Sequence, residues 1–412
     1  MLHKMEKVEG GITAAGGVEA AGVHCGLKKE GEKDLALFRL LQPAAAAGVF
    51  TTNRFKAPPV TLAEKHLTNS IKGLVVNSGN ANACTGEQGF KDAFSTVQKA
   101  AQKLDCHPEE VLVASTGVIG VYLPMDKIYN GIELAFEELS PLGGRDAAEA
   151  ILTTDTVIKE TSYRVLDDST GDGETEGERP SFYIGGTAKG SGMICPDMAT
   201  MLAFLVTDVK ISRDLLQKAL QEAVKYSFNT ITVDGETSTN DAVLLMATGS
   251  SDVEIAGEGE TWEAFKEALL VACRDLSYQI IADGEGVTKI IKLTVKGAPD
   301  YETARTISRS ILNSALVKTA FFGEDANWGR IITAMGASGA DFYPHKVDIF
   351  LGDVQVTSAG RGLVFDEDRA AQVLAQREVP LLVDLHSGPE TLTTWGCDLS
   401  YEYVSINSAY RS

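Results

Sequence analysis

The sequence predicts a mixed α/β fold. Short apolar runs typical of buried strands, such as residues 111–114 and 201–206, alternate along the chain with amphipathic helical patterns such as 211–226. The 40 glycines gather in short clusters, which indicates many tight turns rather than a fibrous or disordered chain. A chain of 412 residues, 44% of them hydrophobic, can bury a sizeable core. By length we expect roughly two or three domains.

Charge and cysteine usage exclude several classes of function. The net charge is −20, which repels nucleic-acid phosphates and anionic lipid surfaces, so we expect neither nucleic-acid nor membrane binding. No apolar window approaches the length of a membrane span, and residues 1–7 lack a signal-peptide core, so we expect a cytoplasmic protein. Six cysteines without CxxC spacing and six dispersed histidines predict reduced, mostly buried thiols and no metal site.

The first third of the chain is predicted to consist of strands, turns and a helix. Residues 36–41 and 48–52 are two strand candidates, and a short buried strand at 74–76 ends in the polar loop 77–86. Three asparagines and two glycines in that loop can hold positive-φ conformations and satisfy their own backbone. The loop either lines a site or supplies only turn chemistry. Helical spacing follows, up to Leu104.

A second strand, at 111–114, is followed by the Ser115-Thr116-Gly117 turn. The hydroxyl of Thr116 and the N–H of Gly117 form a suitable donor pair for a developing oxyanion, because glycine allows a substrate to approach the backbone. Two helical patterns, 132–139 and 147–152, come next. Hydroxyl and carboxyl groups at 153–156 then precede a strand at 163–166, an arrangement that an ordinary polar turn also explains.

We expect the rest of the chain to be organised around the stretch 185–206. It begins as a glycine-rich approach that carries Lys189 and ends as a continuous apolar strand, with Thr200 at the strand entrance. A loop that enters a core strand explains this pattern, yet the position also suits a group that needs precise placement. The preceding segment 168–180 is the most polar of the chain and predicts an exposed hairpin loop or local disorder.

The second half predicts an amphipathic helix at 211–226 with Ser212 as its N-cap, a polar loop at 227–241 and a helix around 262–276. The glycines beside Glu285 either let this side chain project into a cleft or form a hairpin turn before the strand 289–295. Further predictions are strands near 346–356 and 381–385 and a helix around 366–376. The alternation over 397–407 predicts a half-buried strand.

Common catalytic motifs are absent from the sequence, but an N-terminal nucleophile is possible. Lys189 precedes Gly190, which is not the Walker A order, and the chain has neither a GxSxG elbow nor a dinucleotide fingerprint. A threonine that begins a chain can use its own α-amine as the base. Thr200 qualifies only if the Ala199–Thr200 bond breaks, and its hydroxyl could attack the Ala199 carbonyl to form an ester that water hydrolyses.

Over essentially its whole length the chain resembles the ornithine acetyltransferase family, the bifunctional glutamate N-acetyltransferases of arginine biosynthesis. The resemblance implies sandwich-like layers of helices and sheets, N-terminal-nucleophile chemistry, and autocatalytic cleavage into an α chain (1–199) and a β chain (200–412) that form a dimer of αβ pairs. The segments that carry the resemblance are Asn77 to Gly86, Ser115-Thr116-Gly117, Thr153-Thr154-Asp155, Lys189 to Leu202, Asp283 to Gly286, Asn327-Trp328-Gly329-Arg330 and Ile406-Asn407.

The resemblance also implies the reaction. Thr200 would take the acetyl group from N2-acetylornithine and pass it to glutamate in a ping-pong cycle without metal or cofactor, and acetyl-CoA is a candidate second donor. Lys189 suits a substrate carboxylate, and Glu285 suits a cationic amine. The resemblance assigns the oxyanion hole to Thr116 and Gly117, and the substrate contacts to Thr154, Lys189, Thr200, Glu285, Asn407 and Ser412.

Two departures and two alternatives accompany this interpretation. Asp197 and Ser412 stand where the family usually has asparagine and threonine. One alternative is a self-processing aminopeptidase or amidase that uses water as the acyl acceptor. The other is a non-catalytic amino-acid-binding protein, which would keep the polar loops but leave Thr200 without a role.

Overall fold

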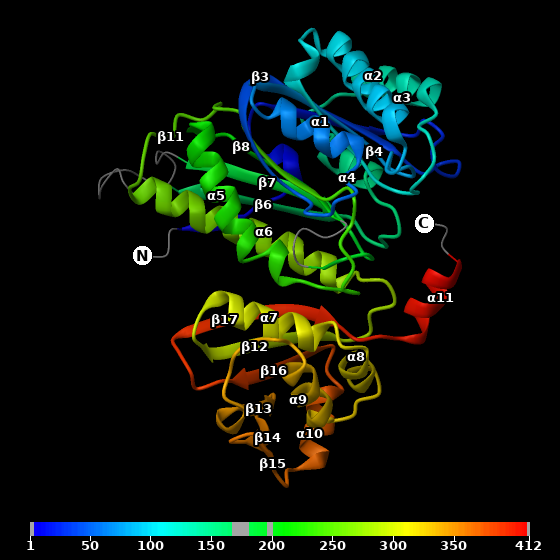
Figure 1. Cartoon of the computed structure of the whole chain (residues 1–412). Helices are drawn as coiled ribbons and strands as arrows, with labels where there is room; N and C mark the ends of the chain where they lie inside the picture. The colour runs from blue at the N-terminus through cyan, green and yellow to red at the C-terminus, as the bar shows by residue number, and fades with distance from the viewer. Residues whose placement is uncertain (1–3, 167–180, 196–200, 410–412) are drawn as a thin grey trace.

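The computed structural model describes residues 4–166, 181–195 and 201–409, and it confirms a mixed α/β fold (Figure 1). Within these residues the strands form a nine-stranded sheet, a six-stranded sheet and the pair β9 (Lys210–Ile211) and β11 (Glu254–Ile255). The nine-stranded sheet runs in the order β1 (Met5–Lys7), β6 (Lys159–Leu166), β7 (Ser181–Lys189), β8 (Leu202–Thr207), β10 (Ala242–Ala247), β3 (Leu35–Phe50), β4 (Ile71–Asn77) and β5 (Val111–Ser115), with β2 (Val18–Val23) also paired to β3.

A single long strand, β3, organises this sheet. We predicted two separate strands at 36–41 and 48–52, and this is wrong because the chain stays extended between them. The first half of β3 pairs with β2 and β4, and its second half pairs with β10. The register against β4 shifts between Arg39 and Ala44, where the exposed Pro43 cannot donate a ladder hydrogen bond.

The two halves of the sheet pack against each other with helices outside. Phe38 of β3 and Phe204 of β8 meet in the core between the halves, with ring centroids 6.1 Å apart. Helices α5 (Arg213–Lys225) and α6 (Glu260–Ala282) cover the outer face of one half. Helices α2 (Gly86–Leu104) and α3 (Met125–Glu137) cover the other. The result is a layered arrangement of helix, sheet, sheet and helix.

The predicted strand at 201–206 corresponds to β8, which is buried on both faces. Alternate side chains enter different cores: Ala203 and Leu205 face α5 and α6, whereas Leu202, Phe204 and Val206 face the core between the sheet halves. Ser212 caps α5, because its side chain accepts a hydrogen bond from the Leu215 N–H. Helices α1 (Pro58–His66) and α4 (Gly144–Ala150) and the 3-10 turns Gly11–Ala14, Pro108–Glu110 and Phe228–Thr230 complete this unit.

The six-stranded sheet has its own core and lies below the first unit in Figure 1. Its strand order is β15 (Arg361–Gly362), β14 (Val354–Ser358), β13 (Asp348–Leu351), β16 (Glu378–Asp384), β12 (Ile290–Ala298) and β17 (Glu390–Cys397). The helices of this part are α7 (Tyr301–Leu312), α8 (Ala315–Phe322), α9 (Trp328–Gly336) and α10 (Glu367–Leu374), with a 3-10 turn at Pro344–Lys346. Helix α11 (Tyr401–Ala409) follows β17, and its Tyr403 packs against the core of the first unit.

Two further predictions need correction. The predicted strand at 397–407 is wrong, because β17 ends at Cys397 and α11 is a helix, none of whose residues is buried. Gly185 and Gly186 belong to β7 rather than to a loop, and a Cβ at Gly185 would lie 2.1 Å from the Gly11 carbonyl oxygen.

Some expectations cannot be compared with the fold. The polar segment 168–180 lies outside the described residues. In the part of the chain that the structure describes, no helix is long and apolar enough to cross a membrane.

Candidate active site

A cavity of about 240 Å³ collects residues from stretches far apart in the sequence. Six residues predicted for the site line it: Thr116, Gly117, Thr154, Lys189, Glu285 and Asn407. The other lining residues are Ala81, Ile119, Thr153, Gly192, Met193, Ser238, Thr239 and Asn240. The cavity is concave, partly polar and sized for a small ligand, as expected of a binding site.

The Thr116–Gly117 turn is held at the end of β5 by close backbone packing. Thr116 is 3% exposed, and its N–H donates to the Asn77 carbonyl at 3.0 Å. Gly117 has φ +131°, and a Cβ on it would lie 2.3 Å from the Gly79 carbonyl carbon. Only glycine fits here, because other residues would meet both the strained φ and the clash.

The asparagine-rich loop supports this turn. The Ser115 hydroxyl donates to Asn77 Oδ1 at 2.6 Å, and Asn77 Nδ2 donates to the Asn80 carbonyl at 2.8 Å. Asn80 Oδ1 in turn accepts the Asn82 N–H at 2.8 Å. These asparagines satisfy backbone and neighbouring groups, as the turn-chemistry alternative predicted, while Ala81 reaches the cavity.

Lys189, the last residue of β7, places a buried amine at the cavity wall. It is 2% exposed, and its Nζ donates to Thr116 Oγ1 at 3.4 Å. Burial lowers the pKa of Lys189 below its usual value, although the nearby Asp155 carboxylate opposes that shift. An ammonium so poorly solvated would interact strongly with an anionic group of a ligand.

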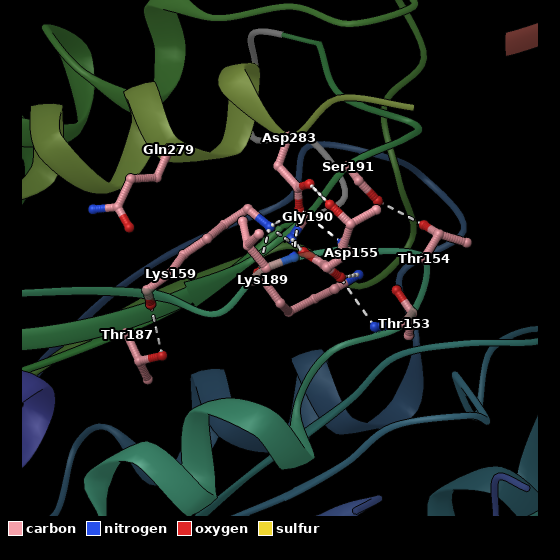
Figure 2. Close-up of polar contacts among 12 residues, drawn as sticks. Thr153, Thr154, Asp155, Lys159, Thr187, Lys189, Gly190, Ser191, Gln279 and Asp283 are labelled. Carbon is pink, nitrogen blue, oxygen red and sulfur yellow. Dashed lines mark hydrogen bonds and ion pairs between the residues drawn. The ribbon is translucent and has the colours of Figure 1, made fainter. Parts of the chain in front are cut away.

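Asp155 lies beside Lys189 and is buried between two lysines, as Figure 2 shows. Its Oδ2 is 3.9 Å from Lys189 Nζ, and its Oδ1 accepts a hydrogen bond from Lys159 Nζ at 2.7 Å. Burial would raise the pKa of Asp155, but the two lysines and the hydrogen bonds outweigh it and lower the pKa to about 2.

Glu285 projects into the cavity from the connection between α6 and β12, so the hairpin alternative is wrong. Asn407 Nδ2, on α11, donates to Glu285 Oε2 at 2.9 Å. A Cβ at Gly192 would lie 2.4 Å from the same carboxylate, so this glycine makes room for the side chain. The Glu285 N–H donates to the Ser191 carbonyl at 2.9 Å, which joins the two loops.

Thr154 completes this side of the cavity, and its hydroxyl forms a 2.6 Å hydrogen bond with the buried Ser191 hydroxyl. Across residues 4–166, 181–195 and 201–409, no group of three or more His, Cys, Asp or Glu side chains forms a candidate metal site.

Sequence reasoning missed the contribution of the loop between α5 and β10. Ser238, Thr239 and Asn240 line the cavity, and Asn240 Nδ2 donates to the carbonyls of Ala81 (2.7 Å) and Ser115 (2.8 Å). The sequence predicts a polar loop at 227–241, and its hydroxyl and amide side chains precede a buried strand. That signal could have marked it as a site wall, although many surface turns share it.

The predicted Ala199, Thr200 and Ser412 lie outside the described residues. The next residue, Met201, is 1% exposed, and its N–H donates to Asp241 Oδ1 at 3.1 Å. Asp241 is fully buried, and this desolvation raises its pKa well above the usual value. Met201 therefore lies beside the segment whose Asn240 lines the cavity.

Residues 19–412 match the model of the ArgJ family. The "Arginine biosynthesis bifunctional protein ArgJ" of Symbiobacterium thermophilum is 49% identical over 99% of this chain and 100% of its own, and the protein of the same name from Bacillus subtilis is 46% identical over 98% of each. A solved Mycobacterium tuberculosis ornithine acetyltransferase, complexed with ornithine, is 38% identical over 47% of this chain and 98% of its own, with a TM-score of 0.41.

Proposed function

The chain belongs to the ArgJ family, and we propose that it is an acetyltransferase of arginine biosynthesis that transfers the acetyl group of N2-acetylornithine to glutamate. The observation that carries this assignment is the convergence of a buried amine, a carboxylate and threonine hydroxyls on one small cavity. Acetylornithine carries groups that complement all three.

Substrate binding follows from charge. The Lys189 ammonium pairs with the α-carboxylate of N2-acetylornithine, and Glu285, oriented by Asn407, pairs with the side-chain ammonium. Two opposite charges at separate points of the cavity fix the direction in which the substrate lies. The acetyl carbonyl is then presented to Thr116 and Gly117, which stabilise the oxyanion.

Self-cleavage prepares the nucleophile. The Thr200 hydroxyl attacks the Ala199 carbonyl carbon, the peptide C–N bond breaks, and the resulting ester is hydrolysed by water. This leaves Ala199 with a carboxylate and Thr200 with a free hydroxyl and a free α-amine. The amine can then act as the base that a threonine nucleophile requires.

Acetyl transfer is a ping-pong cycle. The Thr200 α-amine accepts the hydroxyl proton as Oγ attacks the acetyl carbonyl, and the same proton passes to the departing N2 amine of ornithine. The glutamate α-amine then attacks the acetyl-Thr200 ester, and Oγ regains a proton as N-acetylglutamate leaves. The cycle uses no metal and no cofactor.

The cleavage step is tested by denaturing electrophoresis and mass spectrometry of the purified protein. We expect two fragments that meet at Ala199–Thr200, and a Thr200→Ala variant that stays a single band of 43.9 kDa. A wild-type protein that remains one band would contradict the proposal.

The transfer step separates the acetyltransferase from an amidase. With N2-acetylornithine and glutamate present, we expect N-acetylglutamate and ornithine to form in equal amounts, with little acetate. Acetate released at the same rate with or without glutamate would favour the self-processing amidase. Formation of N-acetylglutamate from acetyl-CoA and glutamate would identify acetyl-CoA as a second donor.

A further inference from the structure

A buried cluster of charges stands next to the cavity but outside the set of described residues that line it. We call Lys159, Asp155 and Asp283 the Lys159 cluster (Figure 2). Lys159 Nζ donates to Asp155 Oδ1 at 2.7 Å and to Asp283 Oδ2 at 2.6 Å, and also to the Val157 carbonyl at 3.3 Å. The side chains of Lys159 and Asp155 are 0% exposed and that of Asp283 is 6% exposed. A salt bridge this deeply buried is a costly way to stabilise a fold, which suggests another role.

The two carboxylates lie next to residues from different walls of the cavity. Asp155 follows Thr154 directly and accepts the Thr153 N–H at 3.0 Å. Asp283 precedes Glu285 by two residues and accepts the Thr156 N–H at 3.0 Å. Lys159 therefore joins the loop that carries Thr154 to the loop that carries Glu285, although Lys159 and Asp283 are 124 residues apart.

The cluster also determines what Lys189 can contact. Asp155 Oδ1 accepts hydrogen bonds from Lys159 and from the Gly190 N–H at 2.6 Å, and Oδ2 accepts the Thr153 N–H. Lys189 Nζ stands 3.9 Å from Oδ2, which is beyond hydrogen-bond range. Asp155 thus attracts the ammonium of Lys189 without binding it directly, and Lys189 instead donates toward Thr116 at the cavity.

We propose that Lys159 is a positioning residue that aligns Lys189 and Glu285 for recognition of the two opposite charges of the substrate. The inference rests on the proposed function. If Lys159 is replaced by methionine, Lys189 becomes the partner of Asp155 and turns from the substrate carboxylate. Asp283, two residues before Glu285, loses its buried cation and keeps only its hydrogen bonds from the 156–157 segment, so the Glu285 loop is held less firmly.

The test is the kinetics of Lys159→Met on two substrates. N2-acetylnorvaline has the carbon chain of N2-acetylornithine but lacks the terminal amine, so the ratio of their kcat/KM values reports how well Glu285 is placed. We expect KM for N2-acetylornithine to rise about tenfold or more, and that ratio to fall by a similar factor, because weakening a hydrogen bond between charged groups costs affinity of this order. The kcat value should change less than KM.

Val356→Ala is the control for a loss of stability alone. Val356 is 0% exposed in the core of the six-stranded sheet, and its truncation should lower the thermal midpoint without changing KM or the substrate ratio. If Lys159→Met does not fold, Asp283→Asn keeps the shape of the side chain and removes its charge. It should raise KM for N2-acetylornithine and lower the substrate ratio, each by about threefold, within the usual range for coupled residues.

The outcomes distinguish the proposed function from the positioning role of Lys159. A wild-type enzyme that transfers no acetyl group from N2-acetylornithine overturns the proposed function. An active wild type, combined with wild-type KM and substrate ratio in Lys159→Met or Asp283→Asn, overturns the positioning role alone. A KM that rises equally for both substrates would also contradict alignment of Glu285.

Discussion

Two buried carboxyl groups near the cavity differ in their surroundings, and their pKa values shift in opposite directions. Asp155 has Lys159 and Lys189 beside it, so its ionised form is stabilised. Asp241 accepts the Met201 N–H with Oδ1, while its Oδ2 has no hydrogen-bond partner among the described residues. Desolvation without a bound cation favours its neutral form. Near one cavity, the surroundings therefore stabilise the ionised form of one aspartate and the neutral form of the other.

Asp155 should stabilise the fold at neutral pH and lose that effect in acid. Its pKa is lowered to about 2, so the stability it contributes is complete above its unfolded pKa of 3.8 and disappears as the pH falls toward 2. Relative to Asp155→Asn, we expect an advantage of about 2 kcal/mol at neutral pH that shrinks below pH 4. Urea unfolding of both proteins between pH 2 and 7 measures it, and a constant difference would contradict this expectation.

Asp241 should behave in the opposite way. Its folded pKa is raised, so its contribution to stability is complete below the unfolded value of 3.8 and is lost as the pH rises toward the folded pKa. Asp241→Asn keeps an oxygen for the Met201 N–H and cannot ionise. We expect the thermal midpoint of Asp241→Asn, measured relative to that of wild type, to be higher at pH 8 than at pH 4. A difference that falls as the pH rises would refute the raised pKa.

At the level of elements, turns at the ends of strands bring most of the chemistry to the cavity. Thr116 and Gly117 follow β5, and Lys189 ends β7. β7 pairs with β6 and β8, and β5 pairs with β4, so the sheet ladders give these turns a rigid support. The helix α11 is the exception, since none of its residues is buried and yet Asn407 reaches Glu285.

Gly117→Ala adds only one methyl group but should strongly reduce acetyl transfer. The new Cβ would lie 2.3 Å from the Gly79 carbonyl carbon at φ +131°, so the backbone of the Thr116–Gly117 turn, the proposed oxyanion hole, must move. We expect acetyl transfer to fall by about 100-fold or more, the usual effect of a lost oxyanion donor.

Gly120→Ala is the matched control for Gly117→Ala. Gly120 also has a positive φ, +80°, but a Cβ there meets no heavy atom within 4 Å. It should lose about 1 kcal/mol of stability from backbone strain and retain its activity. Equal activities in steady-state assays of the two variants would contradict a special role for Gly117.

For the whole molecule, the proposed cleavage would divide one continuous sheet between two chains. Residues 1–199 contain β7 and β3, and residues 200–412 contain β8 and β10. The pair β7–β8 is hydrogen-bonded from Ile184 opposite Thr207 to Lys189 opposite Leu202, and β3 pairs with β10 over a similar length. The two chains would share both ladders and the cores on either side of them.

Cleaved chains should therefore remain together without a covalent bond. We expect both fragments to elute as one species in size-exclusion chromatography without denaturant, and to separate only in urea or guanidinium. The unit built on the nine-stranded sheet, to which both chains contribute strands, should unfold in a single transition. Fragments that elute apart in native buffer would contradict a shared sheet.

The sequence by itself determined several local elements and the family. Helix α5 and its Ser212 cap follow from periodicity and capping within a few residues, and β8 follows from an unbroken apolar run. The resemblance to ornithine acetyltransferases rests on short motifs that the sequence displays directly. Six of the residues it indicated line the cavity, whereas Thr200 and Ser412 lie outside the described residues.

Only the tertiary structure decided which of these pieces meet. The continuity of β3, the helical form of α11, the Asn240 wall and the Lys159 cluster were not predicted. The physical reason is that periodicity reports whether a residue is buried, not against what. Lys159 and Asp283 become partners only because the folded sheet and α6 bring them together, across a separation that local pattern cannot span.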